Sequence, residues 1–365
     1  MTLKKILLFG GRGTPALAVL KGLRLECPEV EVILGEFRPV FLARYSRYAN
    51  RTKLFPSPVV DFSAFARELK TYVAAESIDL IIPGYEEVFH LAAALQDQPA
   101  KVFTASLEIL KRLHSKKQVQ ELDWGDVKTL QAVELRTQEV GLPAVVKPEY
   151  SRFGIGVAIL ESNQQVASFR NKRLLVQEYI AGQNVSVSVL ARNGKIVLIT
   201  GYLTPITAGL GAGVYFVQVS LPEFVVHSLT GVVKQLALTG FYGFDFKRNQ
   251  AGEYYLLECN PRLTSGIHLW SVRNMAAALL ELPITSAQTL VEKQVLVASV
   301  LYGPRVLFSK ILAGRTGQDV ILHDGGLLAF AMQIPIFLQF LILALRHNLT
   351  PEEAMVRDIH YTPII

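Results

Sequence analysis

The sequence predicts a mixed fold, with an α/β part followed by an α+β part. The first observation is a βαβ pattern, in which a strand at residues 4–9, a glycine-rich turn and a helix at 16–25 lead to a second strand at 30–34. The second is a pair of short apolar runs, 244–247 and 253–259, joined by the turn sequence Asn-Gln-Ala-Gly, which predicts a β-hairpin. With 365 residues the chain is long enough for two or three domains.

The composition narrows the classes of function. The formal net charge of +6 suits an anionic small-molecule ligand, and no basic run is interleaved with aromatic residues, so nucleic acid is not an expected partner. Cys27 and Cys259 lie far apart without metal-ligand spacing, which predicts no disulfide and fits a reducing compartment. The apolar run after Lys4 and Lys5 is too short for a signal-peptide core, so a cytoplasmic location is expected.

The predicted hairpin carries two acids, an amide and a cation. Asp245 falls in its first strand, and Glu258 and Asn260 stand two residues apart in the second, so both of these point to one face. Oxygen ligands of this kind suit Mg²⁺, which completes its shell with phosphate oxygens and water. Arg262 follows and supplies a cationic fork for the same phosphate. The pattern predicts a metal and phosphate site, and an ordinary exposed hairpin with a charged rim is the alternative.

At these residues the sequence resembles the ATP-grasp superfamily, the carboxylate-amine ligases and their carbamoyl phosphate synthase relatives. The metal motif of that superfamily is an acid followed at a distance by Glu-x-Asn-Pro-Arg, and here Asp245 precedes Glu258-Cys-Asn-Pro-Arg262. The resemblance implies an ATP-grasp fold with an N-terminal Rossmann-like domain, and ATP with Mg²⁺ or Mn²⁺ as cofactors. It covers residues 4–270.

The same resemblance divides the chain into three expected parts. These are a Rossmann-like domain at 1–105, an ATP-grasp nucleotide- and metal-binding domain at 106–275, and an apolar C-terminal extension at 276–365 that packs on the core.

Two acids follow the strand expected at 78–83. Glu86 and Glu87 come directly after Gly84-Tyr85, and open α/β sheets bind ligands at the carboxyl ends of their strands, so either acid is a candidate for substrate contact. A solvated acidic first turn of the next helix is an equal alternative. The segment PGYEEVF, residues 83–89, also resembles a branch of the ATP-grasp superfamily that is described as carbamoyl phosphate synthase-like.

The glycine turn near the start of the chain has a second interpretation. Gly11-x-Gly13-x-x-Ala16, with Glu36 further on, formally matches a dinucleotide fingerprint. This signal alone is weak, so a nicotinamide cofactor is the minor alternative.

Lysines are expected on the ATP phosphates. Lys116, on a helix expected at 107–122, matches a superfamily cation that reaches phosphate, and Lys117 is the competing assignment. Lys147 stands in an otherwise apolar strand expected at 143–148, where a buried cation needs an anion such as triphosphate.

The loop after that strand departs from the superfamily pattern. Its residues are Ser151, Arg152, Phe153 and Gly154, where the superfamily more often has several glycines and a lysine. Free backbone N–H groups in such a loop can still cradle phosphate.

The resemblance also implies an adenine pocket with apolar walls. Its residues are Gln177, Glu178, Tyr179 and Ile180. Asn184 stands where a ribose-binding glutamate is usual, and it can hydrogen-bond a hydroxyl but brings no charge.

The resemblance weakens after residue 270. Residues 292–308 are expected to form paired strands, and Thr350 is expected to cap a last helix. Residues 327–345 contain no charge and are long enough to cross a membrane. Because two glutamines and a proline interrupt this run, burial in the protein core is favoured over membrane association.

The resemblance implies an ATP-dependent carbon–nitrogen ligase that converts a carboxylate into an acyl phosphate for attack by an amine or a similar nucleophile. Lys147 and Arg262 would spread the developing charge, and His268 would orient substrate or act as an acid–base group unless it is structural. Two alternatives stay open: phosphorylation of a hydroxyl, enol or carbamate, and nucleotide binding without turnover. Small-molecule substrates are the expected partners, and a homodimer is compatible with the sequence.

Overall fold

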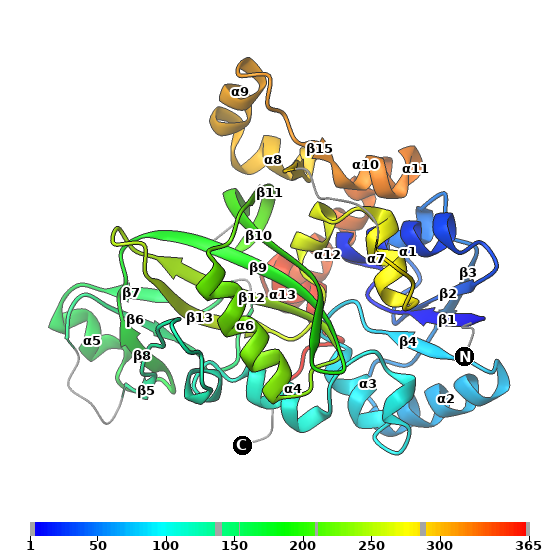
Figure 1. Cartoon of the computed structure of the whole chain (residues 1–365), viewed down its shortest axis with the longest axis horizontal. Helices are drawn as coiled ribbons and strands as arrows, with labels where there is room; N and C mark the ends of the chain where they lie inside the picture. Colours follow the sequence, from blue (N-terminus) through cyan, green and yellow to red (C-terminus); the bar gives the residue numbers. More distant parts are fainter. Residues whose placement is uncertain (1–3, 136–140, 153, 209–210, 285–289, 363–365) are drawn as a thin grey trace.

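The computed structural model describes residues 4–362 apart from 136–140, 153, 209–210 and 285–289. Its described residues form three sheets surrounded by helices (Figure 1). The predicted combination of α/β and α+β parts is confirmed.

The N-terminal part is a parallel sheet between helices. Its strands, in the spatial order β3-β2-β1-β4, are β1 (Lys5–Leu8), β2 (Glu31–Glu36), β3 (Arg51–Leu54) and β4 (Leu80–Ile82). Successive side chains of a strand point to opposite faces, so Ile6 and Leu8 pack with α1 (Thr14–Glu26), whereas Leu7 packs with α2 (Phe62–Ala75). The βαβ start of the chain is therefore present as predicted. The helix α3 (Val88–Ala94) and the 3₁₀ turns η1 (Leu42–Tyr45) and η2 (Pro99–Lys101) complete this part.

Two glycines bring the loops after β1 and β4 together. Gly10 has a φ of 77°, and a Cβ atom there would lie 2.6 Å from the Cα of Gly84. A Cβ on Gly84 would lie 2.3 Å from the carbonyl oxygen of Phe9. Only residues without a side chain allow this approach, which places Glu86 and Glu87 at the carboxyl ends of the strands.

A large sheet forms the centre of the molecule. Its spatial order is β13-β12-β9-β10-β11-β14-β15. Its longer strands are β9 (Gln183–Arg192), β10 (Lys195–Ala208), β11 (Ala212–Val219), β12 (Gly240–Arg248) and β13 (Tyr254–Asn260), and its short edge strands are β14 (Glu292–Gln294) and β15 (Gln318–Asp319). The strands β12 and β13 pair antiparallel, so the predicted hairpin is present. The helix α6 (Glu223–Gln235) packs its apolar side, including Val225 and Leu229, against this sheet. The 3₁₀ turn η4 (Ser265–Leu269) and α7 (Val272–Leu279) follow the hairpin.

A small antiparallel sheet lies beside the large one (Figure 1). Its order is β5-β8-β6-β7, and its elements are β5 (Val133–Glu134), β6 (Ala144–Lys147), β7 (Ala158–Leu160), β8 (Leu175–Glu178) and the helix α5 (Asn163–Phe169).

The helix expected at 107–122 is shorter than predicted. The helix α4 (Leu107–His114) ends at Ser115, and a separate 3₁₀ turn, η3 (Gln118–Glu121), follows. The hydroxyl of Ser115 donates to the carboxylate of Glu149, and the backbone N–H of Lys116 donates to the Glu149 carbonyl oxygen at 3.3 Å. These contacts with a distant loop end the helix.

The prediction of paired strands at 292–308 is wrong. The strand β14 (Glu292–Gln294) is only three residues long, and it is followed by α8 (Leu296–Tyr302) and α9 (Pro304–Leu312). The carboxylate of Asp319 accepts the N–H of Leu296 at 2.7 Å at the start of α8, and Pro304 begins α9. The rest of the chain forms β15 (Gln318–Asp319), α10 (Val320–Gly325), α11 (Leu327–Ala331), α12 (Gln333–His347) and α13 (Pro351–Val356). Thr350 caps α13 as predicted.

The apolar run is not a buried core segment. By length and composition Leu327–His347 could cross a membrane, and 22% of its most apolar window is buried. Ile336 and Phe340 on one face of α12 are buried in the apolar cluster that also contains Phe41 and Leu42. The opposite face is exposed, so the prediction that the whole run is core is wrong: a single helix that packs on one side covers only that side.

Candidate active site

The predicted metal ligands face one another across the β12–β13 hairpin. Asp245 is the register partner of Glu258, and Asn260 lies two pairs further along, opposite Gly243. The side-chain amide nitrogen of Asn260 is 3.0 Å from Oδ2 of Asp245 and 3.4 Å from Oε1 of Glu258. Ser186 on β9 donates its hydroxyl to Oδ1 of Asp245 at 2.5 Å. The structure thus brings all three predicted ligands together.

The charges at this hairpin are arranged to receive a cation. Burial, and then the neighbouring Glu258, raise the pKa of Asp245 to about 6. Burial also acts to raise the pKa of Glu258, but Lys116 and Lys147 together lower it below its ordinary value. Two facing carboxylates and an amide that can turn its oxygen toward them form a donor set that fits Mg²⁺.

Two lysines approach the carboxylates from the small sheet and its connection. The Nζ atom of Lys116 is 3.2 Å from Oε2 of Glu258 and donates to the carbonyl oxygen of Ser151 at 3.0 Å. Lys147 on β6 is 5% exposed and donates to the carbonyl oxygen of Leu257 at 3.1 Å. Burial lowers the pKa of Lys147 to about 8, although Glu258 opposes this shift. An anion bound between these cations would stabilise their charged forms.

Lys117, the competing assignment, lies elsewhere. Its side chain is exposed and lines a shallow surface pocket with Arg112 and Arg173. The sequence left open which of the two lysines lies at the site. In the structure Lys116 is the one beside the hairpin.

Glu86 joins the N-terminal sheet to the hairpin. Its Oε1 atom accepts from Nε of Arg262 at 3.0 Å, and its Oε2 atom lies 3.1 Å from Nη2 of Arg152. Arg262 also approaches Oδ1 of Asn260 at 3.4 Å. Burial acts to raise the pKa of Glu86, but the two arginines hold it at about 2. Glu86 is therefore a buried, charged acid paired with two arginines and not a solvated acid on a helix turn.

Glu87 and Glu36 have different partners. The carboxylate of Glu87 accepts the N–H groups of Gly84 and Tyr85, both at 2.9 Å, and burial followed by the charge of Glu36 raises its pKa to about 7. Glu36 is held by Arg12 through two hydrogen bonds, of 2.9 and 2.6 Å. Because Glu36 is buried in this pair, it is not a free ribose acid of the kind a dinucleotide site requires.

The residues expected around ATP lie on both sides of the hairpin. Ser151 contacts Lys116 as described, Gly154 has a φ of 70°, and Phe153 lies outside the described residues. Arg152 pairs with Glu86 and also donates to the carbonyl oxygen of Tyr361 at 3.1 Å, so its guanidinium is engaged by these two residues.

The expected adenine residues are the last two of β8 and the two that follow it. Gln177 is buried and donates to the carbonyl oxygen of Leu130 at 3.1 Å, whereas Glu178 is exposed. Tyr179 and Ile180 are half-buried. Asn184 is the second residue of β9 on the large sheet and accepts from Nζ of Lys247 at 2.8 Å. This lysine supplies a positive charge near the position where a glutamate is usual.

His268 is not brought to the carboxylates. It is buried on η4, where Nδ1 is 3.1 Å from Oδ2 of Asp324 and Nε2 is 3.1 Å from the hydroxyl of Thr14. Lys21 completes this cluster at 3.2 Å from Oδ1 of Asp324. Both ring nitrogens therefore have partners outside the hairpin, as expected of a structural histidine.

Sequence reasoning missed Ser186, which orients Asp245. A signal for it exists in β9, where Val185, Val187 and Val189 alternate with Ser186 and Ser188. That alternation predicts a strand with one apolar face and one face of small polar groups, and the serine face adjoins the hairpin.

Comparison with known proteins identifies similar chains. A family model described as ATP-grasp domain matches residues 116–266. The chain is 24% identical over 212 residues to the arginine-specific carbamoyl phosphate synthase large chain of Bacillus subtilis, covering 51% of this chain and 20% of that protein. It is 22% identical over 201 residues to the D-alanine–D-alanine ligase of Aquifex aeolicus, covering 50% of this chain and 67% of that protein.

A solved structure shares the fold. The biotin carboxylase domain of Hydrogenobacter thermophilus 2-oxoglutarate carboxylase, a dimer solved with MgADP and bicarbonate, superposes with a TM-score of 0.62 at 15% identity, over 79% of this chain and 72% of that one. The match covers about a fifth of the length of the carbamoyl phosphate synthase large chain and about two thirds of the length of the D-alanine–D-alanine ligase.

Proposed function

The chain is a member of the ATP-grasp superfamily, and we propose that it is a Mg-ATP-dependent ligase that activates a carboxylate as an acyl phosphate for attack by an amine or another nucleophile. The observation that carries this proposal is the pair of carboxylates, Asp245 and Glu258, facing across β12 and β13 with Lys116 and Lys147 beside them. A site of two acids and two cations can hold a metal and a polyphosphate at once.

In the first step, an oxygen of the substrate carboxylate forms a bond to the γ-phosphorus of ATP, and the bond from that phosphorus to the bridging oxygen of ADP breaks. In the second, the nucleophile attacks the carbonyl carbon, the bond to the phosphate oxygen breaks, and an amine nucleophile loses a proton. The charge that moves is phosphate charge, so the protein need only position and neutralise it.

The residues divide this work. Asp245, Glu258 and Asn260 would hold Mg²⁺, which supplies positive charge to the phosphate oxygens when bound. Lys147 and Lys116 would neutralise the triphosphate from the small-sheet side. Their position beside Glu258 supports this role, because the carboxylate keeps both lysines directed at the hairpin.

Arg262 would hold the transferred phosphoryl group from the opposite side. Its Nε atom is occupied by Glu86, whereas Nη1 and Nη2 make hydrogen bonds to the carbonyl oxygen of Leu263 at 3.1 Å and to Asn260 at 3.4 Å. Glu86 thus orients the guanidinium beside the metal ligands. The substrate would enter between the loop that carries Glu86 and the hairpin, where the carboxyl ends of the N-terminal strands open.

The second candidate function is nucleotide binding without turnover. The observation that favours it is the position of Arg152, whose guanidinium contacts Glu86 and the carbonyl oxygen of Tyr361 and not the lysine–carboxylate cluster. In that function the protein would respond to ATP by a change in binding or shape and release no product.

One experiment separates these functions. Purified protein is incubated with Mg-ATP and either paired carboxylates and amines or hydroxyl, enol and carbamate acceptors, and both ADP and free phosphate are measured. A ligase gives equal amounts of both, phosphorylation of a hydroxyl, enol or carbamate gives ADP without free phosphate, and a binding protein gives neither. The variant Glu258→Gln, measured in parallel, corrects for contaminating ATPase, and a wild-type rate no higher than that of the variant would exclude both enzymatic functions.

We also propose a cellular location, a class of substrates and an oligomeric state for the protein. The chain would act in the cytoplasm on small-molecule substrates, as its reducing-type cysteines suggest, since Cys27 and Cys259 are both free and buried. A homodimer is proposed because the similar biotin carboxylase domain is a dimer. Sedimentation velocity of the purified chain tests the oligomeric state.

A further inference from the structure

The C-terminal helices expose an extensive apolar surface. We use the name C-terminal apolar surface for the exposed faces of α8, α9, α11 and α12. More than half of the exposed large apolar side chains in the described residues lie between residues 300 and 345. Leu312, Leu327 and Leu345 are the extreme cases, exposed by 74%, 75% and 75%. Along one edge of the molecule α8, α9, α10 and α11 follow one another, opposite α2 and α3 (Figure 1). Exposed apolar area on this scale marks an interaction site.

The opposite faces of the same helices are fixed to the protein. Ala329, Ile336 and Phe340 are buried in the same apolar cluster as Phe41 and Leu42. On α8 and α9, Leu307 is buried near β10 and β11, and the hydroxyl of Ser299 donates to the carbonyl oxygen of Val214 at 3.1 Å. The helix α12 would have to leave this core to cross a bilayer, so its packing suits a position parallel to a surface.

Within residues 295–350 the acids are buried and the basic residues lie at the edges of this surface. Between residues 295 and 350 the acids are Asp319 and Asp324, which are 8% and 4% exposed and make internal hydrogen bonds. The cations of the same segment are Arg305, Lys310, Arg315 and Arg346. Lys310 is paired with Glu292 at 2.8 Å, so Arg305, Arg315 and Arg346 supply the excess of positive charge. An apolar surface with an excess of basic charge at its edges complements an anionic layer that has an apolar interior.

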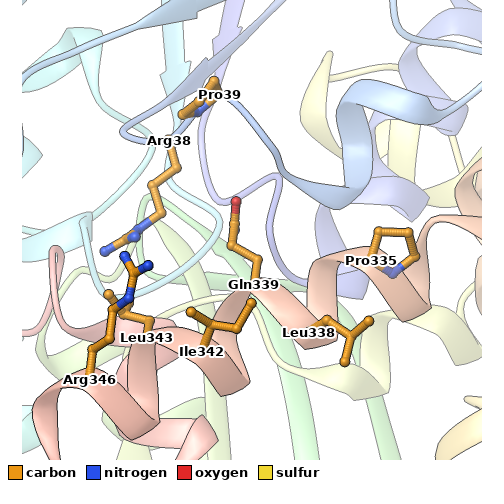
Figure 2. A pocket seen from close by; sticks show the side chains of 8 residues that line it. All are labelled: Arg38, Pro39, Pro335, Leu338, Gln339, Ile342, Leu343 and Arg346. Atoms are coloured by element: carbon orange, nitrogen blue, oxygen red, sulfur yellow. The ribbon is translucent and has the colours of Figure 1, made fainter.

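A groove beside α12 combines both properties. It has a volume of about 570 Å³ and lies between Arg38-Pro39 and α12, with Leu338 and Ile342 in its apolar wall and Arg346 at its rim (Figure 2). Arg38 is bound by Asp358 at 2.8 Å, whereas Arg346 has no ion-pair partner among the residues that the structure describes. Such a groove offers a wall for an acyl chain and a cation for a phosphate group.

We propose that the α11–α12 part of the C-terminal apolar surface docks on an anionic phospholipid bilayer, with α11 and α12 lying in the interfacial layer and the basic residues facing the head groups. Interfacial helices bind in this way when an apolar face and basic residues act together. The inference does not depend on the proposed catalytic function, because none of these residues belongs to the ATP site.

Flotation of the full-length protein with vesicles tests the proposal. Vesicles of pure phosphatidylcholine are compared with vesicles that also contain phosphatidylglycerol, at low and at high salt. We expect the protein to float with the phosphatidylglycerol vesicles and to bind pure phosphatidylcholine several-fold more weakly. The variant Arg346→Gln should lose about fivefold in binding to the anionic vesicles, as expected for one basic residue near such a surface.

Matched substitutions locate the contact. Leu327→Glu and Leu345→Glu each place a charge at a site that is 75% exposed, so neither should disturb folding, and each should abolish flotation. Val60→Glu, at an 84% exposed site outside this surface, should float as the wild type does. Circular dichroism confirms that all three variants are folded.

Three results would overturn the proposal. The first is wild-type protein that stays with neither kind of vesicle. The second is flotation that Leu327→Glu, Leu345→Glu and Val60→Glu leave equal. The third is a wild-type dimer in vesicle-free solution that Leu345→Glu converts to a monomer without any vesicle binding, since the surface would then be an interface between two copies of the chain.

Discussion

Arg262 donates its Nε hydrogen to Oε1 of Glu86 at 3.0 Å, which ties the end of the β12–β13 hairpin to the loop after β4. Arg152 contacts the other oxygen of the same carboxylate at 3.1 Å. One buried acid therefore holds two arginines that come from different parts of the chain, and its charge is required for both.

Replacing this acid tests the contact. Glu86→Gln should destabilise the protein by about 3 kcal/mol at pH 7, because it leaves two buried cations without their anion. The folded-state pKa of Glu86, about 2, lies below the ordinary value of 4.5, so its stabilisation is present above pH 4.5 and is lost as the pH falls toward 2. Urea titrations should show the difference between variant and wild type shrinking over that interval. The exposed Glu108→Gln is the control, and an equal difference at pH 7 and pH 3 would contradict the prediction.

The neighbouring acid should show the opposite dependence on pH. Burial and Glu36 raise the folded-state pKa of Glu87 to about 7, so the stability that its neutral form contributes is fully present below pH 4.5 and is lost as the pH rises through 7. Glu87→Gln keeps the oxygen that accepts from Gly84 and Tyr85 and removes the charge. It should stabilise the protein by about 3 kcal/mol at pH 8 and have little effect at pH 4, measured by urea denaturation. A variant that is no more stable than the wild type at pH 8 would refute this.

The carboxylate pair should matter for activity more than for folding. Asp245→Asn and Glu258→Gln should each lower metal-dependent ATP turnover by about two orders of magnitude or more, since each removes a charged ligand from a set of three. Asp245→Asn should also stabilise the ligand-free protein above pH 6, because it removes a buried negative charge that faces Glu258. Thermal denaturation and a coupled ADP assay measure the two effects. Full turnover in both variants would mean that the hairpin has only a structural role.

The sequence predicted the parts of the molecule whose signals are local. The hairpin with Asp245, Glu258 and Asn260 lies within a short segment, where strand alternation and turn residues decide both the pairing and the face on which each ligand lies. The βαβ start is equally local. The choice between Lys116 and Lys117 does not depend on a local signal, because it depends on where α4 ends. Contacts of Ser115 and Lys116 with Glu149, in a loop distant in the sequence, end that helix.

The parts that sequence reasoning missed depend on contacts between distant residues. Arg12 pairs with Asp358 at 2.6 Å, so the C-terminal segment closes over the N-terminal sheet, and no periodic pattern reports such a contact. The short apolar stretches within residues 292–308 are compatible with either a strand or a helix. Their packing against β10 and β11 favours helices. The run at 327–345 was assigned to the core by composition, whereas burial depends on what covers a helix.

Lys147 gives the sharpest test of the ATP site because its two predicted effects have opposite signs. Its folded-state pKa of about 8 lies below the ordinary 10.5, so below pH 8 its buried charge costs stability, and this cost disappears as the pH rises from 8 to 10.5. Lys147→Met keeps the aliphatic stem and removes the charge, and it should stabilise the ligand-free protein by about 3 kcal/mol at pH 7.

The same substitution should weaken ATP binding by about one to two orders of magnitude, because the triphosphate loses a desolvated cation. Isothermal titration calorimetry of ATP with Mg²⁺ measures the loss, and urea denaturation of the ligand-free protein measures the gain. Lys117→Met is the matched control, since this neighbouring lysine is exposed and should change neither quantity. If Lys147→Met bound ATP as tightly as the wild type while gaining stability, Lys147 would be a buried structural cation, and the anion that compensates it would have to be Glu258 alone.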